Sequence, residues 1–94
     1  MTTSAFPDRR RDLIYRQVDD EVCVYDPIRD RILLLNATSA LMLDLCDGTR
    51  TWEQIEAEIA AVFRVDRATV SRDVETMRAE FRRAGLLAKG SASA

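Results

Sequence analysis

The sequence has no histidine, and only two of its 94 residues are cysteines. Histidine is the side chain that most often serves as a general base or binds a metal ion. The isolated thiols of Cys23 and Cys46 are too few for a disulfide scaffold or for a zinc site, which takes about four close ligands. The sequence also lacks a nucleophile beside a base and a glycine-rich phosphate loop. We therefore expect no catalytic residue, no metal and no cofactor, so the chain alone should not be an enzyme.

Long apolar runs are also missing, and a membrane span needs about 20 consecutive apolar residues. The arginines at positions 9–11 are not followed by an apolar stretch of the signal-peptide type. Hydrophobic residues make up 47% of the chain, which is enough for a folded core. We expect a cytoplasmic protein without a membrane partner. It should have a flexible N-terminus over residues 1–11, one domain over residues 12–89 and a flexible tail over residues 90–94.

The first part of the expected domain carries the pattern of three short strands joined by polar turns. Val22 and Val24 alternate with Cys23 and Tyr25, so the two pairs should lie on opposite faces of a strand. The last of the three stretches is apolar on both faces, which is typical of a strand whose two faces are both covered. In so small a protein, one face can pack on the core while the other is left for a partner. The stretches that favour strands are LIYRQV at 13–18, VCVYD at 22–26 and RILLLN at 31–36.

From residue 36 onward the apolar residues recur with the period of α-helices. Asn36 is a good N-cap for a first helix, and Gly48 fits just beyond the end of that helix. Thr51 and Gln54 have the spacing of a capping box and predict the start of a second helix. The residues that share the apolar face of the second helix are Trp52, Ile55, Ile59, Val62 and Phe63.

A third helix is expected between Asp66, which can cap its start, and Gly85, which marks its end. The short link FRVD joins the second helix to the third, so the two form a helix-turn-helix. Three strands followed by three helices predict an α+β fold of the winged helix-turn-helix type with an antiparallel sheet. Apolar residues recur along the third helix at helical spacing, and these are Val70, Val74, Met77 and Phe81.

A helix-turn-helix raises the question of DNA binding, because Thr69–Arg72 stand where a DNA-reading helix would begin. DNA-binding domains usually carry a basic footprint that contacts the phosphates. This chain has 14 basic and 16 acidic residues, and its third helix carries five arginines against four acidic residues. The charge balance therefore argues against a nucleic-acid partner. Winged-helix DNA binding is kept as an alternative, and so is a domain that only dimerises or docks on another protein.

Residues 33–55, LLLNATSALMLDLCDGTRTWEQI, resemble the signature of the PqqD family. That signature has a Leu-Asn before the first helix, then an Asp-Gly, a Thr and a hydrophobic helix. The similarity covers about residues 13–88, but the hairpin lacks the Pro-Glu pattern of the pyrroloquinoline quinone members. The pathway therefore stays open between pyrroloquinoline quinone, a lasso peptide and another modified peptide. The matching positions in this sequence are Leu35, Asn36, Asp47, Gly48, Thr51 and Ile55.

The resemblance implies a peptide chaperone that binds the leader of a ribosomally made precursor peptide. Such a protein presents the precursor to a modifying enzyme or a leader protease, and the leader adds a strand between the third strand and the third helix. An open sheet edge suits this use, because an extended peptide can satisfy its unpaired N–H and C=O groups. The same edge could instead pair with a second copy in a homodimer. The expected peptide-binding residues are Arg31, Ile32, Leu33, Leu34, Leu35, Arg67, Val70, Asp73, Val74, Met77, Arg78 and Phe81.

The purified chain is expected to leave a precursor peptide chemically unchanged when no other protein is present, because no set of catalytic groups can be assembled from its residues. Mass spectrometry of the peptide before and after incubation measures this outcome. A sample incubated with heat-denatured protein reports any spontaneous change. Cleavage or a mass shift that needs the native protein would contradict the expectation.

Overall fold

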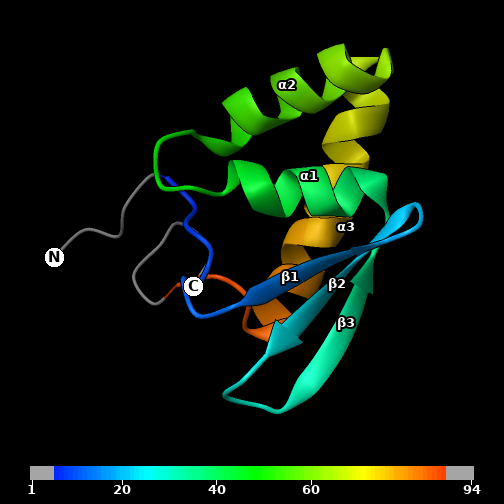
Figure 1. Ribbon diagram of the computed structural model, residues 1–94. Helices are drawn as coiled ribbons and strands as arrows, with labels where there is room; N and C mark the ends of the chain where they lie inside the picture. The colour runs from blue at the N-terminus through cyan, green and yellow to red at the C-terminus, as the bar shows by residue number, and fades with distance from the viewer. Residues whose placement is uncertain (1–5, 89–94) are drawn as a thin grey trace, which may run out of the picture.

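The computed structural model describes residues 6–88, which form three strands followed by three helices (Figure 1). The strands make one antiparallel sheet in the order β1-β2-β3, which confirms the predicted α+β fold. Within the described part of the chain, no helix combines the length and the apolar character needed to cross a membrane. The predicted tail over residues 90–94 lies outside the described residues. The elements are β1 Ile14–Val18, β2 Glu21–Asp26, β3 Arg31–Leu35, α1 Ala37–Leu45, α2 Trp52–Phe63 and α3 Arg67–Ala84.

The sheet is built from two tight hairpins around the central strand β2. Val24 lies opposite Tyr15 of β1 and opposite Leu33 of β3, so these three side chains share one face. Asp19 and Asp30 sit in the two turns with φ angles of 54° and 50°. Aspartate adopts this left-handed conformation more readily than most residues. The predicted polar turns therefore set the register of the strands.

Two of the three helix starts carry the side-chain caps that the sequence predicted, whereas Asp66 stands at the N-cap position of α3 without a side-chain capping hydrogen bond. The side chain of Asn36 accepts a hydrogen bond from the backbone N–H of Ser39 at 2.9 Å. Thr51 and Gln54 form both hydrogen bonds of a capping box at the start of α2. Gly85 ends α3 with a φ of 70°, a left-handed conformation that glycine adopts without strain. Each cap acts over a few residues, which is why the sequence alone could predict it.

The Asp-Gly-x-x-Thr stretch forms the link between α1 and α2. The Asp47 carboxylate accepts hydrogen bonds from the hydroxyl and the backbone N–H of Thr49 at 2.6 and 3.0 Å. It also accepts a bond of 2.6 Å from Arg50. Hydrogen bonds from Thr49, supported by Arg50, lower the pKa of Asp47 to about 2. Gly48 follows with a φ of 84°. This motif therefore shapes a turn and positions α2.

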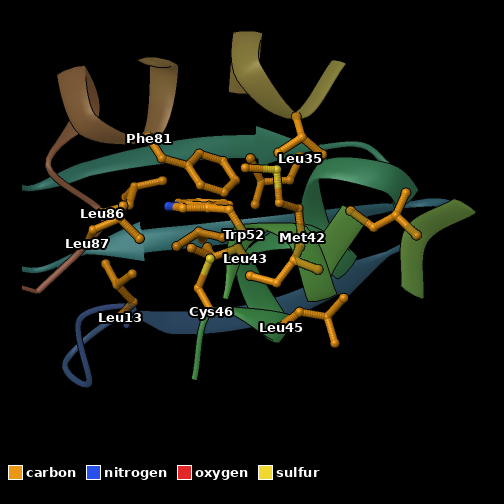
Figure 2. Packing of buried hydrophobic residues seen from close by; sticks show 14 of the residues in the cluster. Leu13, Leu35, Met42, Leu43, Leu45, Cys46, Trp52, Phe81, Leu86 and Leu87 are labelled. Carbon is orange, nitrogen blue, oxygen red and sulfur yellow. The ribbon is translucent and has the colours of Figure 1, made fainter. Parts of the chain in front are cut away.

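The hydrophobic core lies between one face of the sheet and the helices. Figure 2 shows side chains from the helices, from β3 and from the segment after α3 gathered together. Residues that lie far apart in the sequence, from Leu13 to Leu87, are thus buried in one cluster. Its members are Leu13, Val24, Leu35, Met42, Leu43, Leu45, Cys46, Trp52, Ile55, Ile59, Val70, Val74, Phe81, Leu86 and Leu87.

The N-terminal segment over residues 6–11 is held against the rest of the domain. The backbone N–H of Arg9 donates to the carbonyl oxygen of Cys46 at 2.8 Å. The backbone N–H of Arg10 donates to the carbonyl oxygen of Leu86 at 2.9 Å. These hydrogen bonds join the N-terminal segment to parts of the domain that lie far away in the sequence.

The structure decides which face of β3 meets the core. Leu35 is 8% exposed and Leu33 is half-buried, and both lie on the face that packs against the helices. Ile32 and Leu34 lie on the other face and are 67% and 61% exposed. The sequence could not settle this, because the run has no polar residue to mark its outer face.

Leu35→Ala is expected to lower the free energy of unfolding by about 2–5 kcal/mol, because the truncation leaves a cavity in the core. Leu34→Ala makes the same chemical change on the neighbouring residue and should cost far less, since that side chain is already largely in water. Urea unfolding followed by circular dichroism compares the two variants. Equal losses would contradict the assignment of the two faces.

Candidate functional site

The free edge of β3 is the feature of this fold that can take a further strand. β3 pairs with β2 along one side, and no described strand pairs with its other side. A free strand edge presents N–H and C=O groups that an extended peptide can bind. β1 forms the second edge of the sheet. β3 differs from β1 because its two ends meet α3 and α1.

Arginines tie the beginning of β3 to the end of α3. Arg29 donates to the carbonyl oxygen of Ala84 at 2.5 Å, and Arg31 donates to the same oxygen. Arg10 donates to the carbonyl oxygen of Gly85 at 3.1 Å. The last carbonyl groups of a helix lack partners within the helix, and positive charge there also favours the helix dipole. These contacts hold one end of β3 close to α3.

The buried carboxylate of Asp26 holds these arginines in place. Arg10 donates two hydrogen bonds to it, at 2.7 and 3.0 Å, and Arg31 lies 3.6 Å away. The backbone N–H groups of Ile28 and Arg29 donate to it at 3.0 and 3.3 Å. The hydrogen bonds from Arg10 hold the pKa of Asp26 well below its usual range, although burial acts in the opposite direction. We call Asp26 and the three arginines the Asp26 cluster.

A small cavity of about 50 Å³ lies near the other end of β3. Thr38, in the first turn of α1, is three residues beyond the end of β3, so the cavity lies where that strand passes into the helix. Phe63 and Val65, which close the end of α2, are 37% and 38% exposed. The cavity can therefore receive an apolar side chain from solvent. It is lined by Thr38, Ile59, Phe63, Val65, Val70, Asp73, Val74 and Met77.

The α3 residues that the sequence indicated for peptide binding separate into two groups. Val70, Val74 and Phe81 are at most 3% exposed, so they belong chiefly to the core. Asp73 is exposed and Met77 is half-buried, and both line the cavity. Of this set, Asp73 and Met77 therefore offer most of the accessible surface.

The predicted arginines of α3 face α2. Arg67 lies 3.4 Å from the carboxylate of Glu56. The Arg78 guanidinium lies 5.0 Å from the centre of the Trp52 ring, a cation–π contact that helps to pack α3 against α2. Arg78 is therefore half-buried against α2, and its expected part in peptide binding stays a prediction. A charge reversal at Arg78 would disturb the fold as well as any binding.

The strand residues of the predicted site do not all face the same way. The inner face of β3 carries Arg31, Leu33 and Leu35, whereas Ile32 and Leu34 point away from the helices. An added strand would reach both sets, since its own side chains alternate between the two faces.

Sequence reasoning missed the cavity residues of α1 and α2, and of the Asp26 cluster it indicated Arg31 alone. In the sequence, the cavity could have been indicated by Phe63 and Val65, two apolar residues in the short FRVD link between α2 and α3. Asp26 and Arg10 belong to different segments, and no short motif joins them.

The fold and the free β3 edge define a small α+β domain with a place for an added strand. The family described as coenzyme PQQ synthesis protein D (PqqD) matches residues 21–87. This chain belongs to the PqqD family. No curated protein matches the chain. A solved structure described as "TbiB1 in Complex with the TbiA(beta) Leader Peptide" has 26% sequence identity and a TM-score of 0.75, and the match covers 90% of this chain and 98% of that one.

Asp26→Asn is expected to lower the melting temperature at pH 7, because it leaves Arg10 in a largely buried site without its charge partner. The lowered pKa of Asp26 adds stability that is complete above the usual carboxyl pKa near 4 and is lost as the pH falls through the lowered pKa. The difference in melting temperature between the wild type and Asp26→Asn should therefore become smaller below about pH 4. Thermal unfolding at a series of pH values measures both effects.

The matched control for this experiment is Asp20→Asn, which removes an exposed carboxylate from the β1–β2 turn. Its melting temperature should stay close to that of the wild type, because exposed charges contribute little to stability. If Asp26→Asn melts at the same temperature as this control at pH 7, the Asp26 cluster does not hold the fold together.

Proposed function

We propose that this protein binds the leader region of a ribosomally synthesised precursor peptide as a fourth strand along the β3 edge. The observation that carries the proposal is the free edge of β3 beside α3, in a PqqD-family chain whose fold is similar to that of leader-bound TbiB1. The protein acts as a peptide chaperone and performs no chemistry on the peptide. It presents the bound precursor to a modifying enzyme or a leader protease.

Backbone pairing supplies much of the binding in this mode, and the side chains supply the specificity. β3 is five residues long, so it can pair with a leader segment of about the same length. Alternate side chains of that segment point toward the helices. One of them, near the end of β3, can enter the cavity beside Phe63, Val65 and Met77. We infer a leader with a bulky apolar residue at that position.

The charge of Asp73 adds a second element of specificity at the rim of the cavity. Asp73 is exposed, and it lines the cavity together with Thr38. A basic or hydroxyl-bearing leader residue next to the apolar anchor can pair with this carboxylate. Because ribosomally made precursors are synthesised in the cytoplasm, the same proposal places the protein there.

DNA binding is the alternative use of a winged helix-turn-helix, and the charge balance argues against it. Two of the five arginines of α3 are engaged within the domain, since Arg67 is paired with Glu56 and Arg78 lies over Trp52. The whole chain also has a net charge of −2. Affinity that depends on phosphate contacts falls steeply with salt, whereas strand pairing beside an apolar cavity depends on salt only weakly.

The protein is expected to bind a synthetic leader peptide, taken from a precursor encoded beside its gene, with a dissociation constant of about 1 µM or lower, or roughly −8 kcal/mol. Isothermal titration calorimetry measures the affinity. The same peptide with N-methyl groups at alternate backbone positions cannot pair along β3, so it should bind far more weakly. Equal binding of both peptides, or no binding of the unmodified one, would overturn strand addition.

A pair of variants tests the cavity in the same titration. Val65→Asp places a charge in the cavity lining, and a leader side chain that enters the cavity would bury this charge without a partner. Because burying an unpaired charge is costly, the variant should bind the leader at least about tenfold more weakly. Val62→Asp is the control, because Val62 is 62% exposed on α2 and does not line the cavity. Both variants should keep the helical circular dichroism of the wild type. If both bind the leader equally well, the cavity does not receive a leader side chain.

A further inference from the structure

The face of the sheet that points away from the helices is apolar and exposed. Ile14, Val18, Ile32 and Leu34 on this face are 58%, 43%, 67% and 61% exposed. A sheet with one face in water normally alternates apolar residues inside with polar residues outside. This face departs from that pattern, and exposed apolar patches of this kind mark interaction sites. We call it the outer face, and the strand register assigns to it Ile14, Arg16, Val18, Glu21, Cys23, Tyr25, Ile32 and Leu34.

The outer face carries two charged residues, and they have opposite signs. Arg16 on β1 lies opposite Cys23 of β2, and Glu21 on β2 lies opposite Val18 of β1. The two charges are therefore diagonal neighbours at one corner of the face. Within the described residues of the chain, neither Arg16 nor Glu21 takes part in an ion pair. Both are available to a partner.

We propose that the outer face binds a second copy of this chain. The diagonal of the face runs from Ile32 through Cys23 to Val18. If two copies face each other across a twofold axis along this diagonal, each of these three residues meets its own counterpart. Tyr25 and Leu34, which lie on either side of the diagonal, then meet each other. The strands of the two sheets cross at a wide angle, as in orthogonal sheet packing.

The charges single out a second copy as the occupant. The same twofold axis brings Arg16 of each copy close to Glu21 of the other. A twofold interface uses the same surface of both subunits, so that surface must be complementary to itself. Apolar residues along the axis and opposite charges exchanged across it meet this condition. An unrelated partner would not require the two charges to be related in this way.

The size of the outer face sets the expected strength of the dimer. The strands are five, six and five residues long. At a rise of about 3.3 Å per residue and a spacing of about 4.8 Å between strands, the face measures roughly 17 by 14 Å. A stable interface buries about 800 Å² per partner, which is more than this face offers, so the face supports only a weak dimer.

Dimerisation through the outer face leaves the free edge of β3 available. The interface uses side chains that stand above the sheet, whereas strand addition uses backbone groups at the edge of β3. One dimer can therefore bind two leader peptides. A dimer paired through the β3 edges would instead release its partner when a leader binds. The inference does not rest on the proposed function, because the dimer forms without a peptide.

Sedimentation velocity of the full chain, without a peptide, over roughly 10 µM to 1 mM tests the proposal. We expect the wild type to change from monomer to dimer over this range. Arg16→Glu alone and Glu21→Arg alone should each remain monomeric, because like charges then meet across the axis. An equimolar mixture of these two variants should dimerise again, since both contacts become attractive once more. A mixture that stays monomeric would overturn the twofold arrangement.

Ile32→Asp should abolish the dimer, because it places a charge on the axis of an apolar interface. Ile28→Asp is the matched control, since Ile28 is 75% exposed but lies in the β2–β3 turn. It should dimerise like the wild type. Circular dichroism checks that each variant is folded. If Ile32→Asp unfolds, the equimolar mixture of Arg16→Glu and Glu21→Arg still tests whether the outer face forms the dimer.

Two further results would overturn the proposal. In the first, the wild type stays monomeric up to 1 mM and Ile32→Asp binds the leader peptide more weakly than the wild type does. The outer face would then bind the leader peptide and not a second copy. The other is a wild-type dimer that dissociates when the leader peptide is added, which would place the contact at the edge of β3. A dimer that persists with two peptides bound supports the outer face.

Discussion

The contact between the buried carboxylate of Asp26 and the guanidinium of Arg10 is the interaction on which the candidate site depends. It joins the N-terminal segment to the β2–β3 turn, and Arg10 also binds the end of α3 at Gly85. A buried carboxylate is stable only while its donors surround it, so the three segments hold one another in place. The distance between β3 and α3 thus depends on a charge cluster at one end of the free edge.

β3 is at once part of the core, the free edge and the outer face. Leu35 anchors it in the core, its unpaired backbone edge can bind a peptide strand, and Leu34 stands on the exposed outer face. Natural sheets usually shield free edges and limit exposed apolar patches, because both promote association. A small domain that keeps both features beside each other has surfaces for two partners at once.

Local signals in the sequence predicted the elements of this fold, because each acts over a few residues. The alternation of Val22 and Val24, the cap at Asn36 and the stop at Gly85 all appear in the structure where the sequence placed them. The contact of Arg78 with Trp52 was not evident from the sequence, because it depends on how α3 packs against α2. Sequence spacing along one helix cannot indicate which neighbouring element its polar side faces.

The sequence by itself determined the order of strands and helices, the caps and the resemblance to the PqqD family, since these reside in local patterns and in a short motif. The tertiary structure alone decided which face of the RILLL strand is buried, which residues line the cavity and how Asp26 gathers its arginines. The physical reason is that burial and ion pairing depend on segments brought together from opposite ends of the chain. Ile32 and Leu33 are adjacent and both apolar, and only the position of the helices makes Leu33 half-buried and leaves Ile32 exposed.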